Sequence, residues 1–276
     1  MPETADTAIG EAVLDLAVTK AAEAFGPRLE AVYALGSLAH DGFSSLVSDV
    51  DLGLILTDPL TAQDATVIAE VSAQVRETGA PLADRLSVFW GSRHSLTHGG
   101  TPGRFPPLDR LDLLRYGRLL HGQDVRDGLP TPTHRELVVT AAQFCLNLVA
   151  RYDLKGWVRN PAVLLDQGPR SYTKPVLFPT RFLYTARTGA IGRNHDAAEH
   201  LVNHYPGAAA DVAGAALRWR ELPAAPEDSQ AIALLREGLI PLYLSCLQVH
   251  AELARTWGED LLAEELTAAH DQLEDG

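Results

Sequence analysis

The sequence predicts an α/β domain followed by a domain made of helices alone. Short apolar runs typical of strands alternate with helical patterns up to about residue 130, and only helical patterns follow. The chain has 276 residues, a length that fits two domains better than one hydrophobic core. Near residue 130 the sequence reads Asp-Gly-Leu-Pro-Thr-Pro, which is typical of a linker, so we expect domains at 1–130 and 131–276.

The elements of the first domain are separated by clear breaks. A helix is expected over 8–25, where apolar residues recur at helical spacing until Gly26-Pro27 ends it. A second helix is expected over 61–77, closed by a glycine and a proline. Apolar runs of four to seven residues predict strands at 31–35, 50–56, 86–90 and 118–121.

The second domain is expected to begin with a long helix. Thr133 is placed to cap this helix, and Glu136 follows at the spacing of a capping box. Glycine, proline and asparagine punctuate the helical patterns that follow. These patterns predict further helices at 174–188, 195–204, 207–220, 229–254 and 258–273.

Composition and charge limit the classes of partner. The chain carries 36 acidic and 23 basic side chains, which gives a formal net charge of −13. This charge makes nucleic acid an unlikely general partner, because a phosphate backbone attracts clustered lysine and arginine. It suits a small cationic molecule, and it allows a nucleotide whose phosphates are held through a metal ion.

The sequence predicts a cytoplasmic protein that does not span a membrane. Its first residues are acidic and lack the basic region of a signal peptide, and its apolar runs are shorter than the roughly 20 residues of a membrane span. Cys145 and Cys246 lie in apolar helical runs, so we expect them to be buried and reduced. The oligomeric state stays open.

Two aspartates at the start of a predicted strand indicate a metal site. Asp49 and Asp51 are two residues apart, so strand alternation points both side chains to one face. Two carboxylates this close repel each other unless a cation lies between them. Hard oxygen ligands without histidine or cysteine nearby favour Mg²⁺ or Mn²⁺, which usually complete their coordination with water and substrate phosphates.

The preceding strand ends in groups that suit phosphate. Gly36 lets the backbone approach a ligand, and an adjacent N–H with the Ser37 hydroxyl can hold phosphate oxygens. Helix-like residues follow, and a helix N-terminus adds a positive dipole end. Ser48, directly before Asp49, is a further candidate for nucleotide binding. Phosphates at the turn and a metal at the aspartates would form a nucleotidyl-transfer site.

These residues resemble the DNA polymerase β-like nucleotidyltransferase superfamily, in which Gly-Ser is followed after about a dozen residues by Asp-x-Asp and an apolar strand. The segment 113–125 is similar to the stretch that closes this domain in antibiotic nucleotidyltransferases, and 179–201 looks like the helical domain of streptomycin/spectinomycin-type aminoglycoside adenylyltransferases. The resemblance implies a small mixed sheet with helices, a helical bundle, ATP as co-substrate and an aminoglycoside as the first candidate acceptor.

The chain departs from the family pattern at one catalytic position. The family carries a third carboxylate on the next strand, as general base or further metal ligand, and here that place falls on Arg85 or Ser87. Asp84 is the acid nearby, and by alternation it shares a face with Leu86 rather than with Ser87. Either Asp84 takes the role from a shifted register or the role is vacant, which would lower the rate by about 10²–10⁴-fold.

The resemblance also places basic residues of the helical domain on the nucleotide phosphates. Arg193 and His195 lie where such a residue would fall, and Arg193 is the better candidate because its charge is permanent. The alternative is a solvated loop at the start of a helix.

The leading hypothesis is a Mg²⁺-dependent enzyme that transfers AMP from ATP to a hydroxyl of a small molecule. In this hypothesis Asp84 takes the proton of the acceptor hydroxyl. The missing mid-strand carboxylate favours an alternative, a nucleotide-binding or regulatory protein with impaired catalysis. A third hypothesis is a transferase that modifies protein or tRNA, although the acidic net charge of the chain is a poor match for tRNA.

Overall fold

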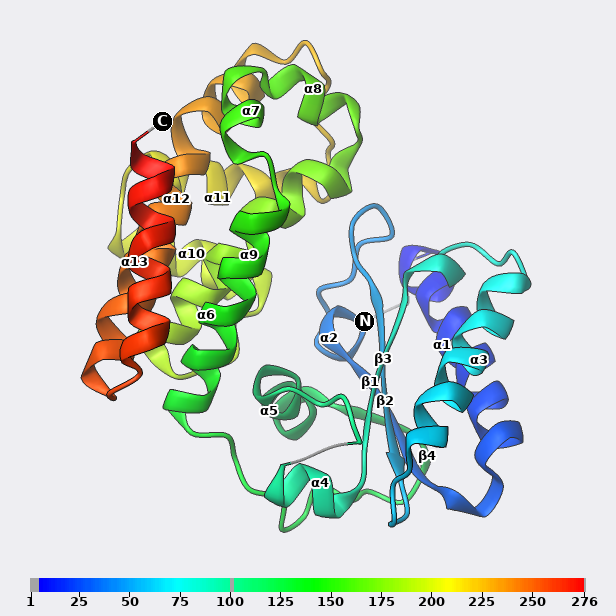
Figure 1. Ribbon diagram of the computed structural model, residues 1–276. Helices are drawn as coiled ribbons and strands as arrows, with labels where there is room; N and C mark the ends of the chain where they lie inside the picture. Colours follow the sequence, from blue (N-terminus) through cyan, green and yellow to red (C-terminus); the bar gives the residue numbers. More distant parts are fainter. Residues whose placement is uncertain (1–4, 100–101, 276) are drawn as a thin grey trace. The chain divides into compact units, whose positions relative to one another are not determined.

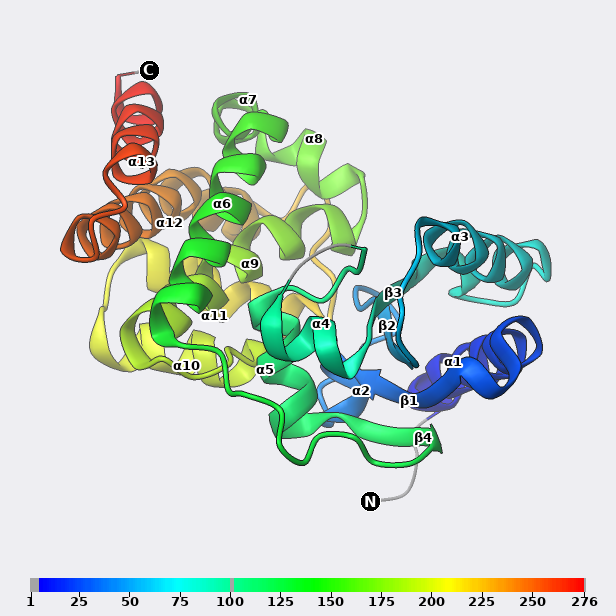
Figure 2. The same cartoon turned by 60° about the horizontal axis from the view of Figure 1, so that its bottom comes forward.

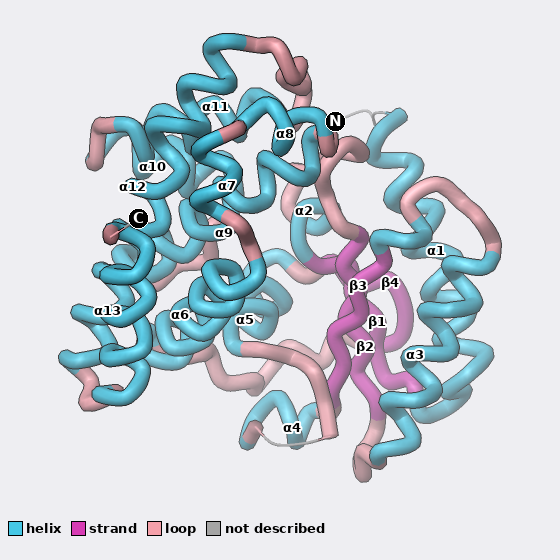
Figure 3. Tube along the Cα trace, turned by 45° about the horizontal axis from the view of Figure 1, so that its top comes forward, coloured by secondary structure: helices cyan, strands magenta, loops and turns pink. Residues whose placement is uncertain are grey.

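The chain divides into two units of different secondary structure, Met1–Pro132 and Thr133–Gly276 (Figure 1). The computed structural model describes residues 5–99 and 102–275. Within these residues, strands occur in the first unit, whereas the second unit contains helices alone (Figure 3). The expected fold class, an α/β region followed by an all-α region, is confirmed.

A mixed sheet forms the centre of the first unit. Its strands are β1 (Leu29–Leu35), β2 (Val50–Leu56), β3 (Leu86–Gly91) and β4 (Arg118–Gly122), in the order β3-β2-β1-β4. β1 runs antiparallel to both of its neighbours, whereas β2 and β3 are parallel. The parallel pair needs a crossover, which α3 (Ala62–Glu77) provides.

Two helices cover one face of this sheet. α1 (Ala5–Phe25) and α3 lie on the same side of the strands (Figure 1 and Figure 2). Alternate residues of β2, including Leu52 and Leu54, are fully buried and belong to one core with Val13 of α1 and Val75 of α3. This pattern follows from the period of two in a strand and the apolar stripe of each helix.

The opposite face has a smaller core and carries the polar residues of interest. Tyr33, Leu35 and Ile55 of the strands are buried there with Leu113, which comes from α5 (Pro107–Tyr116). Asp51 alternates with the buried Leu52, so it belongs to this face of β2.

A buried tyrosine fixes the segment that closes the first unit. The Tyr33 hydroxyl donates to Asp124 Oδ1 at 2.9 Å and accepts from the Val125 N–H at 2.7 Å. The Arg126 guanidinium holds the pKa of the Asp124 carboxyl well below its usual value. Burial raises the pKa of Tyr33 to about 12, because the phenolate would lose its hydration. Asp124, in the segment 113–125 that resembles antibiotic nucleotidyltransferases, therefore has a structural role.

We expect Tyr33→Phe to lower the free energy of unfolding by about 1–3 kcal/mol at pH 7, because the buried Val125 N–H loses its acceptor. The raised pKa of Tyr33 adds a pH dependence: its stabilisation is fully present below the unfolded pKa of about 10 and is lost as the pH rises towards 12. Urea unfolding of both proteins at pH 7, 10 and 12 should show the difference shrinking at high pH. A difference that stays constant would contradict this.

The second unit is a helical bundle, as expected. Thr133 caps its first helix with the capping box read from the sequence: Thr133 Oγ1 accepts from the Glu136 N–H at 3.2 Å. Its helices are α6 (His134–Arg151), α7 (Leu154–Arg159), α8 (Pro161–Asp166), α9 (Pro169–Thr188), α10 (Asn194–His204), α11 (Ala208–Trp219), α12 (Ser229–Thr256) and α13 (Asp260–Glu274).

The longest of these helices, α12, lies at the centre of the bundle. It packs against α6, α9, α11 and α13, with Leu239 and Leu247 fully buried. α12 is long and apolar enough, by length and composition, to cross a membrane, although the sequence had predicted no such segment. Buried core helices meet the same criterion. Cys145 and Cys246 are buried free thiols, as expected, with their Sγ atoms 3.3 Å apart.

Candidate active site

Two sequence motifs meet where β1 ends. Leu35, the last residue of β1, pairs with Asp51 across the antiparallel ladder, so the Asp51 side chain lies beside the next residue, Gly36. A Cβ atom on Gly36 would lie 2.5 Å from Asp51 Oδ2, and Gly36 has a φ of +59°. A larger residue would therefore clash with the carboxylate and strain the backbone. The glycine allows the turn and the aspartate to be in contact.

The two aspartates are partly buried but remain accessible to solvent. Asp49 directly precedes β2, and both Asp49 and Asp51 are half-buried. Oxygen atoms at this depth can reach a small ion and a substrate, and they are the ligands that Mg²⁺ prefers. The donor set therefore fits Mg²⁺ or Mn²⁺.

The two candidate serines differ in their surroundings. Ser37 follows Gly36 in α2 (Gly36–Ala39) and is half-buried, and its carbonyl accepts from the Gly42 N–H at 2.9 Å. Ser48 is buried, and its hydroxyl accepts from the Ser44 N–H at 3.1 Å. Ser48 thus supports the turn before Asp49. Because α2 has four residues, the dipole expected of a following helix is that of a single turn.

A further carboxylate, from Asp112, contacts the Gly36 turn. It is not the mid-strand acid of the family pattern, and the sequence analysis did not predict it. Asp112 of α5 is 7% exposed, and its Oδ2 accepts from the Gly36 N–H at 2.6 Å. Its Oδ1 lies 3.9 Å from His40 Nε2. The signal that could have found it is an acidic residue among leucines, in the run Leu-Asp-Leu-Leu.

Asp84 lies in a different setting from the one predicted. It belongs to a 3₁₀ turn, Ala83–Arg85, that precedes β3, and it is exposed. Strand alternation starts only at Leu86, so the expectation that Asp84 shares a strand face with Leu86 is wrong. Leu82, directly before this turn, has a left-handed conformation with φ of +65°.

Ser87 occupies the position beside the aspartate pair. In the parallel ladder of β2 and β3, Ser87 is the direct partner of Asp51, so both side chains lie on the same face. The other position on which the family's third carboxylate fell, Arg85, lies in the 3₁₀ turn before β3, and its Nη1 donates to the Ser45 carbonyl at 2.7 Å. A neutral hydroxyl therefore stands where the resemblance implies an acid.

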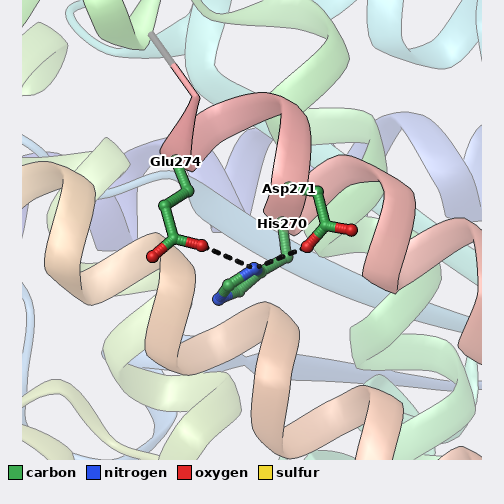
Figure 4. Close-up of side chains that lie close together, drawn as sticks. All are labelled: His270, Asp271 and Glu274. Carbon is green, nitrogen blue, oxygen red and sulfur yellow. Dashed lines mark hydrogen bonds and ion pairs between the residues drawn. The ribbon is translucent and has the colours of Figure 1, made fainter.

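One group of three possible metal ligands occurs elsewhere in the described residues. His270, Asp271 and Glu274, at the end of α13, have ligand atoms within 4.8 Å of one another (Figure 4). Both carboxylates approach the same nitrogen, His270 Nδ1, at 3.2 and 3.8 Å, and both are exposed. This geometry is that of an imidazole paired with acids. Asp49, Asp51 and Asp84 do not form such a group of three within 4.8 Å in the described parts of the chain.

The two basic candidates lie in the second unit and are paired with acids of their own helix. Arg193 directly precedes α10, and its Nε and Nη2 donate to the two oxygens of Asp196 at 2.6 and 3.0 Å. His195 is exposed, with Nε2 3.2 Å from Glu199 Oε1. Their part in phosphate binding stays a prediction.

Comparison with solved structures identifies the fold. A spectinomycin adenyltransferase from Enterococcus faecialis, solved with ATP and spectinomycin, matches with a TM-score of 0.62, covering 86% of this chain and 98% of that chain at 14% sequence identity. The sequence matches no protein-family model and no curated protein. The chain thus shares the fold of that enzyme, and the fold that the resemblance implied is confirmed.

Proposed function

We propose that this chain is a Mg²⁺-dependent nucleotidyltransferase that transfers AMP from ATP to a hydroxyl of a small cationic molecule, with an aminoglycoside as the first candidate. The observation that carries the proposal is the contact between Gly36 and Asp51 in this fold. A bare glycine turn beside a carboxylate pair brings a phosphate-binding element and a metal-binding element together. A cytoplasmic location, where ATP and Mg²⁺ are abundant, belongs to the same proposal.

Each of these residues has a role in binding or orientation. Asp49 and Asp51 would hold the ion, which when bound polarises the α-phosphate and stabilises the charge that develops on it. Gly36 lets a phosphate approach the backbone, and the Ser37 N–H and hydroxyl donate to its oxygens. The acceptor's hydroxyl oxygen bonds to the α-phosphorus, the bond to pyrophosphate breaks, and the hydroxyl proton leaves to a base or to water.

The charge of the chain supports a cationic acceptor. The formal net charge is −13, and three carboxylates lie at or near the Gly36 turn: Asp49, Asp51 and Asp112. A negative field raises the local concentration of positively charged molecules and speeds their association. The amino groups of an aminoglycoside suit this field, whereas a polyanion such as tRNA does not.

A second candidate function rests on Ser87. Because a hydroxyl stands beside Asp51 where an acid is implied, the chain could bind Mg²⁺ and ATP without efficient turnover. It would then act as a nucleotide-binding or regulatory protein.

Pyrophosphate release and thermal unfolding together separate the two functions. The purified chain is incubated with ATP, Mg²⁺ or Mn²⁺, and a panel of aminoglycosides, and the acceptor is weighed by mass spectrometry for an added AMP. Release of pyrophosphate with a modified acceptor supports the transferase. Saturating MgATP should also stabilise the fold, by about 2.7 kcal/mol at 100 times the Kd. Stabilisation without turnover supports the binding protein. If MgATP causes neither stabilisation nor turnover, both candidate functions are overturned.

A further inference from the structure

Asp112 is a buried acid whose contacts all lead to the Gly36 turn. It comes from α5, where its neighbours Leu111 and Leu113 are buried apolar residues. Within the described residues, its side chain contacts the Gly36 N–H at 2.6 Å and the His40 ring at 3.9 Å. A carboxylate at this place serves the turn rather than the packing of its own helix.

Burying this charge is costly unless something compensates it. A carboxylate offers about four lone-pair sites, and Asp112 uses one of them for a hydrogen bond to a neutral amide. His40 Nε2 lies beyond hydrogen-bond distance. Removing the acid would leave the Gly36 N–H without its acceptor. The buried carboxylate therefore acts on the Gly36 turn.

The hydrogen bond fixes the backbone that separates two functional groups. Gly36 has a left-handed φ. Its N–H donates to Asp112, and a Cβ at this position would lie against the Asp51 carboxylate. A charge-assisted bond of this length is stronger than a neutral one. Since the Gly36 N–H is occupied, a phosphate at this turn would be held by other donors, among them the Ser37 N–H and hydroxyl.

The same helix holds the turn at a second point. Tyr116, one helical turn after Asp112, packs edge-to-face on the His40 ring with centroids 5.4 Å apart. α5 thus contacts both ends of the short segment that begins at Gly36.

We propose that Asp112 is a positioning residue of the nucleotide site: it holds the Gly36 turn against Asp51 so that Ser37 and the aspartate pair face one metal–nucleotide complex. This inference rests on the proposed function for its effect on ATP. Its effect on the Gly36 backbone is independent of that function.

Two variants separate the hydrogen bond from the charge. Asp112→Leu removes the acceptor and fills the space with an apolar side chain, so KM for ATP should rise about tenfold or more, and the melting temperature should stay at or fall below that of the wild type because the Gly36 N–H loses its partner. Asp112→Asn keeps an acceptor oxygen, so KM for ATP should stay near the wild-type value while the Mg²⁺ concentration for half-maximal rate rises a few-fold. Asp109→Asn, with the same charge change on the same helix, is the matched control.

Amide hydrogen exchange at Gly36, measured by NMR without nucleotide, gives a readout that needs no activity. Exchange should be faster in Asp112→Leu than in the wild type and near the wild-type rate in Asp112→Asn. Unchanged exchange in both variants, or an unchanged KM for ATP in Asp112→Leu, overturns the proposal. A wild-type chain that neither binds nor uses MgATP refutes the proposed function and the effect on ATP, whereas the exchange result still decides whether Asp112 fixes the turn.

Discussion

Asp51→Asn is expected to lower the rate of pyrophosphate release by about 10³-fold and to remove the stabilisation of the fold by MgATP. In the proposed function Asp51 would provide a ligand oxygen for the metal, and it lies against the Gly36 turn, so its charge would act where the nucleotide phosphates are bound. Loss of an ion that contributes several kcal/mol of transition-state stabilisation corresponds to a loss of this size. Asparagine keeps the shape of the side chain, so the turn itself should survive.

The unfolding of the ligand-free variant gives a second expectation. Asp49 and Asp51 carry like charges at the start of one strand, and replacing one with a neutral amide removes their repulsion. The melting temperature without ligand should therefore stay close to that of the wild type. Replacing a functional residue lowers activity without lowering stability, whereas replacing a structural residue would lower both activity and stability.

Asp41→Asn is the matched control for this prediction. Asp41 lies in the same connection between β1 and β2, is exposed, and has a left-handed φ of +57°, which asparagine also tolerates. The variant makes the same change of charge about ten residues from Asp51 in sequence. It should keep wild-type turnover and MgATP stabilisation. Equal losses in the two variants would mean that charge in general, and not a metal at Asp51, accounts for the effect.

The contact between the two motifs could be predicted from the sequence, because it is set by local features. An apolar run ending in Gly36, a polar connection and a second apolar run after Asp51 predict two neighbouring strands. Once these strands pair, the end of one and the start of the other must meet, as the Leu35–Asp51 register shows. The class of both units followed from the same periodicity.

Asp112 and Asp84 show what this kind of reasoning misses. Asp112 reaches Gly36 across 76 residues of sequence, through the packing of α5 on the sheet, which no local pattern encodes. The prediction for Asp84 extended strand alternation to residues before β3. These residues form a 3₁₀ turn that follows the left-handed Leu82, so alternation does not apply to them. The short helices α7 and α8 were also missed, because six residues do not show a helical period.

Ser87→Asp is expected to increase turnover, by up to about 10²–10⁴-fold if general-base catalysis is the step that limits the chain. Ser87 is the lateral partner of Asp51, and adjacent strands lie about 4.8 Å apart, so a carboxylate introduced there would lie beside Asp51, where the proposed function has the metal and the acceptor hydroxyl. The added charge lies next to Asp51, which disfavours its ionised form without a cation. The gain should therefore depend more steeply on Mg²⁺ concentration than wild-type turnover does.

Two companion variants determine what the gain means. Ser87→Asn has nearly the same shape as Ser87→Asp but provides no base, so it should stay at the wild-type rate. Asp84→Asn should also leave the rate unchanged, because Asp84 lies in an exposed turn ahead of β3. If Ser87→Asp binds MgATP normally and gains nothing, the base role is already filled, and a loss in Asp84→Asn would identify Asp84 as the group that fills it. If turnover rises only in Ser87→Asp, the wild-type chain lacks an efficient base beside the proposed metal site, and nucleotide binding is the activity that its present sequence supports best.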